Sequence, residues 1–334
     1  MEKNQDSKET SRGDQNAVEN SSRLASSGLW LRLFRIAIVT AVLFSLAYLI
    51  NGSLARIRES EFWLRPIDYP KLVLALISYL GAMLLSALFW SLILRSFGHR
   101  PGLLKTLAAF FASQFGKYVP GKAMVIVIRS DMIRDENFTA TQAAASVLIE
   151  TLTWIFVGSI IASALAFWQL AGQPLFQISA IVLAAITGLL TFPPVANWLA
   201  SKFIRGSGAN PFHGLSLKTL TIGWTLMSVG WCLNGLSLWL VVSSIPGADP
   251  QLSDFWLTLT GVSIATVLGF VSLVPGGIGV RELAIIPLLT PRFGSPTAIF
   301  AAVMIRLVWL SAIVLGSAII YGVHTLVERS RAKD

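Results

Sequence analysis

Long runs of uncharged, apolar residues recur along this chain and constrain its fold more than any other feature. The run at 72–94 carries no charged side chain, and as one helix it is long enough to cross the roughly 30 Å hydrocarbon core of a bilayer. Only 13% of the residues are charged, against about 25% in soluble domains. The sequence therefore predicts an all-α, polytopic membrane helix bundle with about six full spans, at 29–50, 72–94, 141–169, 176–192, 220–245 and 298–323.

Two further apolar stretches are interrupted by the same short frame, a Phe followed four residues later by Val-Pro-Gly. The frame begins at Phe115 and again at Phe270. Proline removes a backbone donor and glycine tolerates positive φ, so each copy should break a helix. Such a break at membrane depth is tolerated only where protein or a water-filled cavity satisfies the freed backbone groups. We therefore expect two broken or re-entrant helical hairpins, at 106–133 and 256–289, with their breaks at Pro120, Gly121, Pro275, Gly276, Gly277 and Gly279.

Loop charges predict the topology. Basic residues dominate the loops at 95–105 and 195–218, whereas the loop at 246–255 holds two acids and no base. By the positive-inside rule, both termini of this multi-pass protein are then cytosolic. Three spans separate the broken elements, so the two halves of the chain should be oppositely oriented, as in an inverted repeat. The loop at 51–71 fits less well, because its four basic and three acidic residues would lie outside.

The ends of the chain differ from its middle. Residues 1–28 are polar and are predicted to form a disordered cytosolic tail. They lack the apolar core of a signal peptide. Residues 29–325 would form the transmembrane domain, and 326–334 a second cytosolic tail.

Composition argues against several classes of site. The chain has one Cys, and none of its three His has a second His or Cys at ligand spacing, so we expect no metal and no cofactor. The net charge of +9 could indicate nucleic acid. In a membrane protein it is better explained by basic cytoplasmic loops and contact with anionic headgroups, so we expect no nucleic-acid partner.

Charged residues at or near apolar depth are the candidate site. Placing a charged side chain at mid-membrane costs at least a few kcal/mol of insertion free energy, so such residues usually have a functional or a structural role. The surplus is positive, and a cavity with that surplus suits a phosphate or phosphodiester, which Arg binds as a bidentate fork and Lys as a point charge. The expected substrate-binding residues are Lys117, Lys122, Arg129, Arg281 and Arg306, and the acids in this set are Asp131, Glu150 and Glu282.

The residues leave alternatives open. The Pro-Gly pairs are equally typical of plain interfacial loops. Lys117 and Arg129 could snorkel to the headgroups. Arg306 lies too deep for that, so we expect a buried partner for it, either Glu282 or Glu150. Glu150 itself is either a structural partner of a basic residue or a proton-coupling group, and Glu282 belongs to the same class of buried acid.

The segments 116–122 and 274–282 resemble the two signature segments of the lysylphosphatidylglycerol synthase transmembrane-domain family, also called flippase-like. The resemblance spans roughly 30–325. It implies a bacterial or archaeal cytoplasmic (inner) membrane protein of a stand-alone branch that lies beside envelope glycan or lipid synthesis enzymes. The chain stops at Asp334, without the aminoacyl-transfer domain of full-length synthases, so we expect no enzyme activity. The matching positions are Lys117, Pro120, Gly121, Lys122, Pro275, Gly276, Gly277, Gly279, Arg281 and Glu282.

Three functions compete. The first is a flippase or transporter that moves an anionic lipid or lipid-linked glycan between leaflets through a cationic mid-membrane cavity. The second is a non-transporting membrane partner of a glycosyltransferase or lipid-modifying enzyme. The third is a membrane transferase, although no Gly-x-Ser-x-Gly nucleophile turn or paired-Asp metal motif is found. The expected partners are membrane lipids with anionic headgroups and envelope biosynthesis enzymes.

Overall fold

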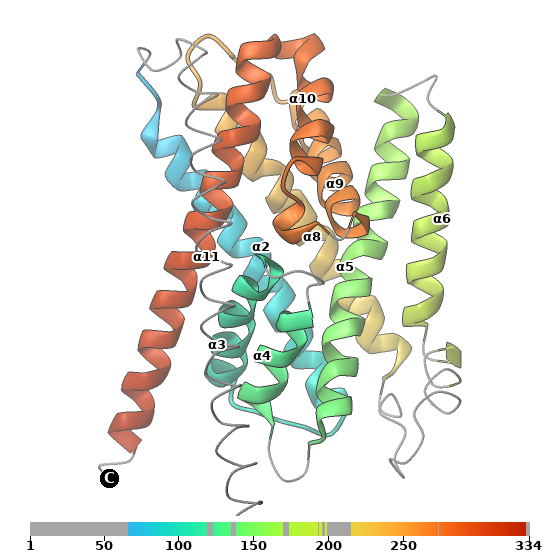
Figure 1. Ribbon diagram of the computed structural model, residues 1–334, viewed down its shortest axis with the longest axis vertical. Coiled ribbons are helices and arrows are strands. Elements are labelled where there is room, and N and C mark those ends of the chain that lie inside the picture. The colour runs from blue at the N-terminus through green and yellow to red at the C-terminus, as the bar shows by residue number, and fades with distance from the viewer. Residues whose placement is uncertain are drawn as a thin grey trace, which may run out of the picture. The chain divides into compact units, whose positions relative to one another are not determined.

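The structure, a computed structural model, is all-helical in its regular elements, as predicted (Figure 1). The predicted span at 29–50 and the tail at 1–28 lie outside the described residues. The residues described are 66–118, 123–134, 138–169, 174–192, 194–195, 198, 215–272 and 274–331.

Five helices in those ranges are long and apolar enough to cross a bilayer, which confirms a polytopic membrane bundle. Four of them correspond to predicted spans. The fifth, α9, is the part of the predicted broken element at 256–289 that precedes the break, and it runs unbroken for 18 residues. The five are α2 (Tyr69–Ser96), α5 (Ala140–Gln169), α8 (Leu217–Ser243), α9 (Asp254–Val271) and α11 (Ser295–Arg331).

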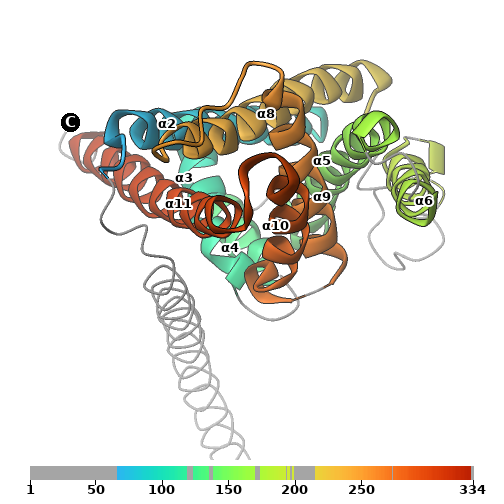
Figure 2. The ribbon, with the colours of Figure 1, turned by 90° about the horizontal axis from the view of Figure 1, so that it is seen from above.

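Two helices occupy predicted spans but end at different residues. The helix α6 (Pro174–Thr191) occupies the predicted span at 176–192 and packs beside α5 at the margin of the bundle (Figure 2). The helix α11 continues to Arg331, past the predicted end of its span at Val323. No Pro or Gly follows Gly322 to stop it, so part of the segment predicted as a tail is helical.

Helices α2 and α8 form the closest pair in the bundle (Figure 2). Two buried serines bridge them, since Ser78 Oγ donates to Leu233 O and Ser237 Oγ donates to Ala75 O, each at 2.8 Å. Side chains of this kind hydrogen-bond across helices in membranes, where apolar contact with a neighbour is no better than contact with lipid. The pair therefore forms a fixed wall against which the shorter helices pack.

A glycine in this wall gives a first prediction. A Cβ at Gly223 would lie 2.1 Å from the ring of Phe89, which is itself fully buried. Gly223→Ala should therefore destabilise the fold by about 1–3 kcal/mol through overpacking, seen as a lower midpoint of thermal unfolding in detergent. Gly322→Ala is the matched control, because nothing lies within 4 Å of its Cβ, and it should be neutral or slightly stabilising. Equal midpoints for the two variants would contradict the close approach.

The first predicted break is present. The helix α3 (Leu103–Ser113) passes into a 3-10 turn, η2 (Gln114–Tyr118), and the chain resumes as α4 (Ala123–Ile133). Both α-helices have 11 residues, about 16 Å at 1.5 Å per residue, so neither crosses a bilayer alone. They pack against each other as a hairpin. Pro120, Gly121 and Lys122 fall between η2 and α4 in the sequence and lie outside the described residues.

The second predicted break is confirmed in its own backbone. After α9 the chain forms a 3-10 turn, η3 (Pro275–Gly277), and then α10 (Val280–Phe293). Gly276, Gly277 and Gly279 have φ of 61°, 66° and 81°, in the left-handed region that side chains rarely adopt. The turn reverses the chain, so α9 and α10 lie against each other as a second hairpin.

A fork of hydrogen bonds closes the open end of this second hairpin. Arg292 Nε donates to Asp254 Oδ1 at 3.0 Å, and the second carboxylate oxygen lies 3.0 Å from an Arg292 Nη atom. Bidentate pairs of this kind fix geometry as well as adding energy. The pair joins the first residue of α9 to the last turn of α10.

The two hairpins meet tip to tip. Figure 1 shows α3 and α4 in the lower half of the bundle and α9 and α10 in the upper half, and the turns η2 and η3 are in contact. At this contact, a Cβ on Gly276 would lie 2.8 Å from Tyr118 Cδ1. Only a residue without a side chain allows the tyrosine ring to approach this closely, so the two frames that the sequence repeats are neighbours in space.

Candidate functional site

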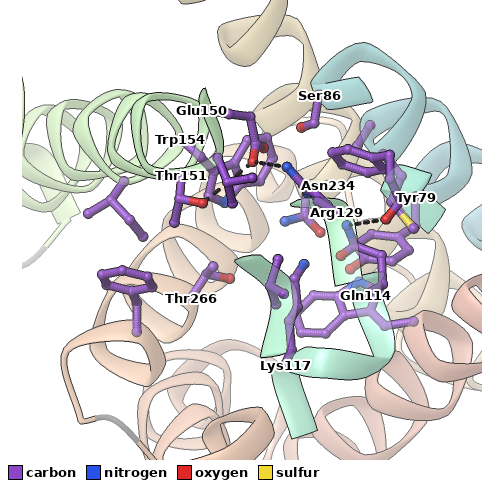
Figure 3. A pocket seen from close by; sticks show the side chains of 18 of the residues that line it. Tyr79, Ser86, Gln114, Lys117, Arg129, Glu150, Thr151, Trp154, Asn234 and Thr266 are labelled. Carbon is purple, nitrogen blue, oxygen red and sulfur yellow. Dashed lines mark hydrogen bonds and ion pairs between the residues drawn. The ribbon is translucent and has the colours of Figure 1, made fainter. Parts of the chain in front are cut away.

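A cavity of about 340 Å³ lies where the two hairpins meet (Figure 3). Its wall draws residues from both hairpins, from η2, and from α2, α5, α8 and α11. Most of the wall is apolar. Its charged side chains, among the described residues, are Lys117, Arg129, Arg281 and Glu150, which is three cations against one carboxylate, a net charge of +2.

Arg129 is the most enclosed of these cations. It is 2% exposed, and its Nη1 donates to Glu150 Oε2 at 2.9 Å while its Nε donates to Ser113 Oγ at 2.9 Å. Its guanidinium carbon lies 4.8 Å from the ring centre of Trp90 and 4.3 Å from that of Phe110. These contacts tie α4 to α3, α5 and α2. Arg129 therefore does not snorkel to the headgroups, and its charge is largely balanced by Glu150.

Arg281 lies in the first turn of α10, and its surroundings differ from those of Arg129. Its guanidinium carbon lies 5.1 Å from the ring centre of Trp309, and in the described part of the chain its Nε has no hydrogen-bond partner and it forms no ion pair. A Cβ on Gly277 would lie 2.8 Å from that Nε, so the glycine makes room for the side chain to fold back along the turn. Packing therefore holds the Arg281 guanidinium at the cavity, and at least its Nε–H donor remains without an acceptor.

Arg306 braces the second break. It forms a buried ion pair with Glu282, and its Nη2 donates to the carbonyl of Gly276 at 3.3 Å. The expectation of a buried acidic partner is thereby confirmed, with Glu282 as that partner. Arg306 is not among the described residues that line the cavity, although the sequence proposed it for substrate binding. Its contacts hold α11, α10 and η3 together beside the cavity.

Lys117 completes the cationic wall. It lies in η2, at the tip of the first hairpin, and Figure 3 shows its side chain pointing into the space faced by Asn234 and Thr266. Lys122, the fifth proposed cation, lies outside the described residues. Of the five proposed cations, the described structure thus brings Lys117, Arg129 and Arg281 together on one cavity.

Several wall residues were missed by sequence reasoning. Gln114 and Asn234 are carboxamides inside apolar stretches and are 1% and 2% exposed, and Tyr79, Thr266 and Trp309 lie on the same wall. A polar side chain at membrane depth is a signal of function whether or not it is charged. Applying that rule to amides as well as to charges would have found Gln114 and Asn234.

Comparison with known families places the chain. A family model described as the lysylphosphatidylglycerol synthase TM region matches residues 32–316, which is most of the chain. The chain belongs to this family. Membership confirms the resemblance of the segments at 116–122 and 274–282, and it makes a lipid-related membrane role the starting point for function. A search of curated proteins found no match.

Proposed function

We propose that this protein moves an anionic lipid, or a lipid-linked glycan, between the two leaflets of a bacterial or archaeal inner membrane. The observation that carries the proposal is the cavity with a net charge of +2 at the meeting point of two broken hairpins. Paired breaks in two halves of a chain are typical of transporters, whose sites lie near the bilayer midplane. A surplus of positive charge there is costly unless an anion balances it.

The mechanism uses Arg281 and Lys117, two cations that line the cavity from the two hairpins. Arg281 offers a planar fork and Lys117 a compact ammonium, and both are established chemistries for phosphate. The headgroup would bind between them while the acyl or prenyl chains stay in lipid. Movement of one hairpin against the other would then open the cavity to each leaflet in turn.

The proposal includes a topology. The two hairpins are re-entrant and form an inverted repeat, and both termini are cytosolic. Support comes from the loop charges and from the opposite placement of the hairpins along the bundle (Figure 1). In this arrangement Arg129 with Glu150 and Arg306 with Glu282 act as braces, one for each hairpin. Glu150 also lines the cavity, which leaves it in position to couple transport to a proton.

Reconstitution tests the proposal. Purified protein is placed in vesicles that contain a tail-labelled anionic lipid, and the appearance of that lipid in the opposite leaflet is timed. Arg281→Ala and Lys117→Ala should each slow translocation by roughly tenfold or more, since a hydrogen bond to a charged group contributes about 1.5–3 kcal/mol. Arg95→Ala is the control, because this exposed residue ends α2 away from the cavity, and its rate should match that of the unmodified protein. Equal rates for all variants would remove the site.

A second candidate function is a non-transporting partner that holds an envelope glycosyltransferase or lipid-modifying enzyme in the membrane. The two buried ion pairs favour it, because they show that charge in this bundle also serves structure. A stable enzyme partner recovered with the protein, together with an unimpaired Arg281→Ala variant in cells, would favour this function over transport.

A further inference from the structure

Arg281 is held in place by an aromatic ring, whereas two nearby buried arginines are held by carboxylates. Its guanidinium carbon lies 5.1 Å from the ring centre of Trp309, and it forms no ion pair with any described residue. An aromatic face attracts a guanidinium through the ring quadrupole but carries no net charge. The ring therefore orients Arg281 without balancing its charge, as the carboxylates do for the other two. Those pairs are Arg129 with Glu150 and Arg306 with Glu282.

Two glycines make room for the Arg281 side chain beside this ring. A Cβ on Gly269, in α9, would lie 3.1 Å from Arg281 Nε and 3.2 Å from its Cγ. A Cβ on Gly277, in η3, would lie 2.8 Å from the same Nε. The side chain therefore lies against bare backbone of both α9 and η3, and a methyl group added at either glycine would displace it.

Trp309 is itself fixed by packing. It is 4% exposed, and its ring stacks on that of Tyr79 with the ring centroids 5.5 Å apart and an interplanar angle of 28°. Trp309 belongs to α11 and Tyr79 to α2, two of the helices that are long and apolar enough to cross a bilayer. A ring enclosed in this way loses little further freedom when a guanidinium packs on it. Trp309 is therefore a rigid support for Arg281.

We propose that Trp309 is a positioning residue, which together with Gly269 aims the Arg281 guanidinium at the anion in the cavity. An arginine side chain loses more rotamer freedom on being fixed than most others. Because Trp309 fixes Arg281 before the anion arrives, binding of the anion does not bear that entropic cost. The inference rests on the proposed function, since it gives Trp309 and Gly269 a role at the same site.

Binding of an anionic lipid by the purified protein tests the proposal. The protein is titrated in detergent with phosphatidic acid, and occupancy is read by native mass spectrometry. Trp309→Leu removes the aromatic face and should weaken binding by about fivefold, which is within the range of a desolvated cation–π contact. Trp309→Phe keeps a face that attracts cations less strongly than indole does, so its affinity should fall between those of Trp309→Leu and the unmodified protein.

Two glycines of α9 separate positioning from stability. Gly269→Ala should weaken binding of phosphatidic acid by a factor similar to that of Trp309→Leu, because the new methyl group displaces Arg281. Its midpoint of thermal unfolding should not fall, since alanine favours a helix over glycine. Gly261→Ala is the matched control. Its Cβ would meet Leu288 Cδ2 at 3.3 Å, and Gly261 does not line the cavity, so binding should be unchanged.

A double-variant cycle determines whether Trp309 acts through Arg281. Arg281→Ala alone should weaken binding by about tenfold or more. Adding Trp309→Leu to it should cause no further loss, because two changes that remove the same contact are not additive. If Trp309→Leu fails to fold, Trp309→Phe and Gly269→Ala take its place in the cycle. Additive losses, or unchanged binding in both of those variants, overturn the proposal.

The two proposals fail separately. If Arg281→Ala weakens binding and slows translocation but the Trp309 and Gly269 variants do neither, the proposed function stands and the positioning role does not. If the cycle is non-additive but no lipid crosses the bilayer, the positioning role stands and transport does not.

Discussion

Replacing Arg306 with Met is expected to lower the free energy of unfolding by about 3–5 kcal/mol, because it leaves Glu282 buried without its cation. The same change removes the donor to the Gly276 carbonyl, so the turn at the second break loses its brace. For a chain of this size the midpoint of thermal unfolding should fall by roughly 10 °C. Unfolding in detergent, followed by circular dichroism, measures the shift.

Two further variants test whether the destabilisation by Arg306→Met comes from leaving Glu282 buried without a cation. Lys71→Met breaks the pair with Asp68, whose side chains are 42% and 39% exposed, and exposed pairs contribute only about 0–1 kcal/mol, so its midpoint should barely move. The double variant Arg306→Met, Glu282→Leu removes both charges and should recover much of the lost stability. A double variant no more stable than the single one would show that the pair is not the cause.

Replacing Gly276 with Ala should be the most damaging change at the tip contact. The substitution forces a side chain into a backbone with φ of 61°, which costs about 1–2 kcal/mol. It also drives a Cβ to 2.8 Å from the ring of Tyr118, which adds about 1–3 kcal/mol of overpacking. If the hairpins work against each other as proposed, translocation should fall along with stability.

Gly279 provides the matched control for that change. It has φ of 81° and ψ of −45° in the same turn, and nothing lies within 4 Å of its Cβ, so Gly279→Ala carries a backbone cost of its own without a clash. Thermal unfolding should rank the unmodified protein above Gly279→Ala, and Gly279→Ala above Gly276→Ala. Adding Tyr118→Ala to Gly276→Ala should restore part of the loss by removing the clash. Indistinguishable glycine variants would mean that the tip contact contributes nothing.

The sequence predicted those features that depend on local chemistry. The second break was predictable because Pro275 and three glycines fix an unusual backbone whatever surrounds them. The pairing of Arg306 with a buried acid followed from its depth in a span, which rules out escape to the headgroups. Both predictions needed only the residue and its position along one helix.

Features that depend on which helices meet could not be predicted in the same way. Arg129 and Glu150 were both named, but nothing in the sequence showed that they face each other, because the contact depends on how α4 packs against α5. The carboxamides Gln114 and Asn234 are about 120 residues apart and share a wall only because η2 and α8 converge on it. Their single polar groups carry no charge, so they gave a weaker signal than the arginines.

The fork between Arg292 and Asp254 bears on how the second hairpin can change position. The Arg292–Asp254 pair joins the end of α10 to the start of α9, so both ends of the hairpin are tied and the two helices should move together. A tilt of the hairpin at this pair would then displace the turn at Gly276, which Arg306 of α11 holds at the other end. Pairs of spectroscopic distance labels, one placed near the Arg292–Asp254 pair and one near Tyr118, would show a single correlated displacement if the α9–α10 hairpin is rigid. They would show independent displacements if the hairpin bends.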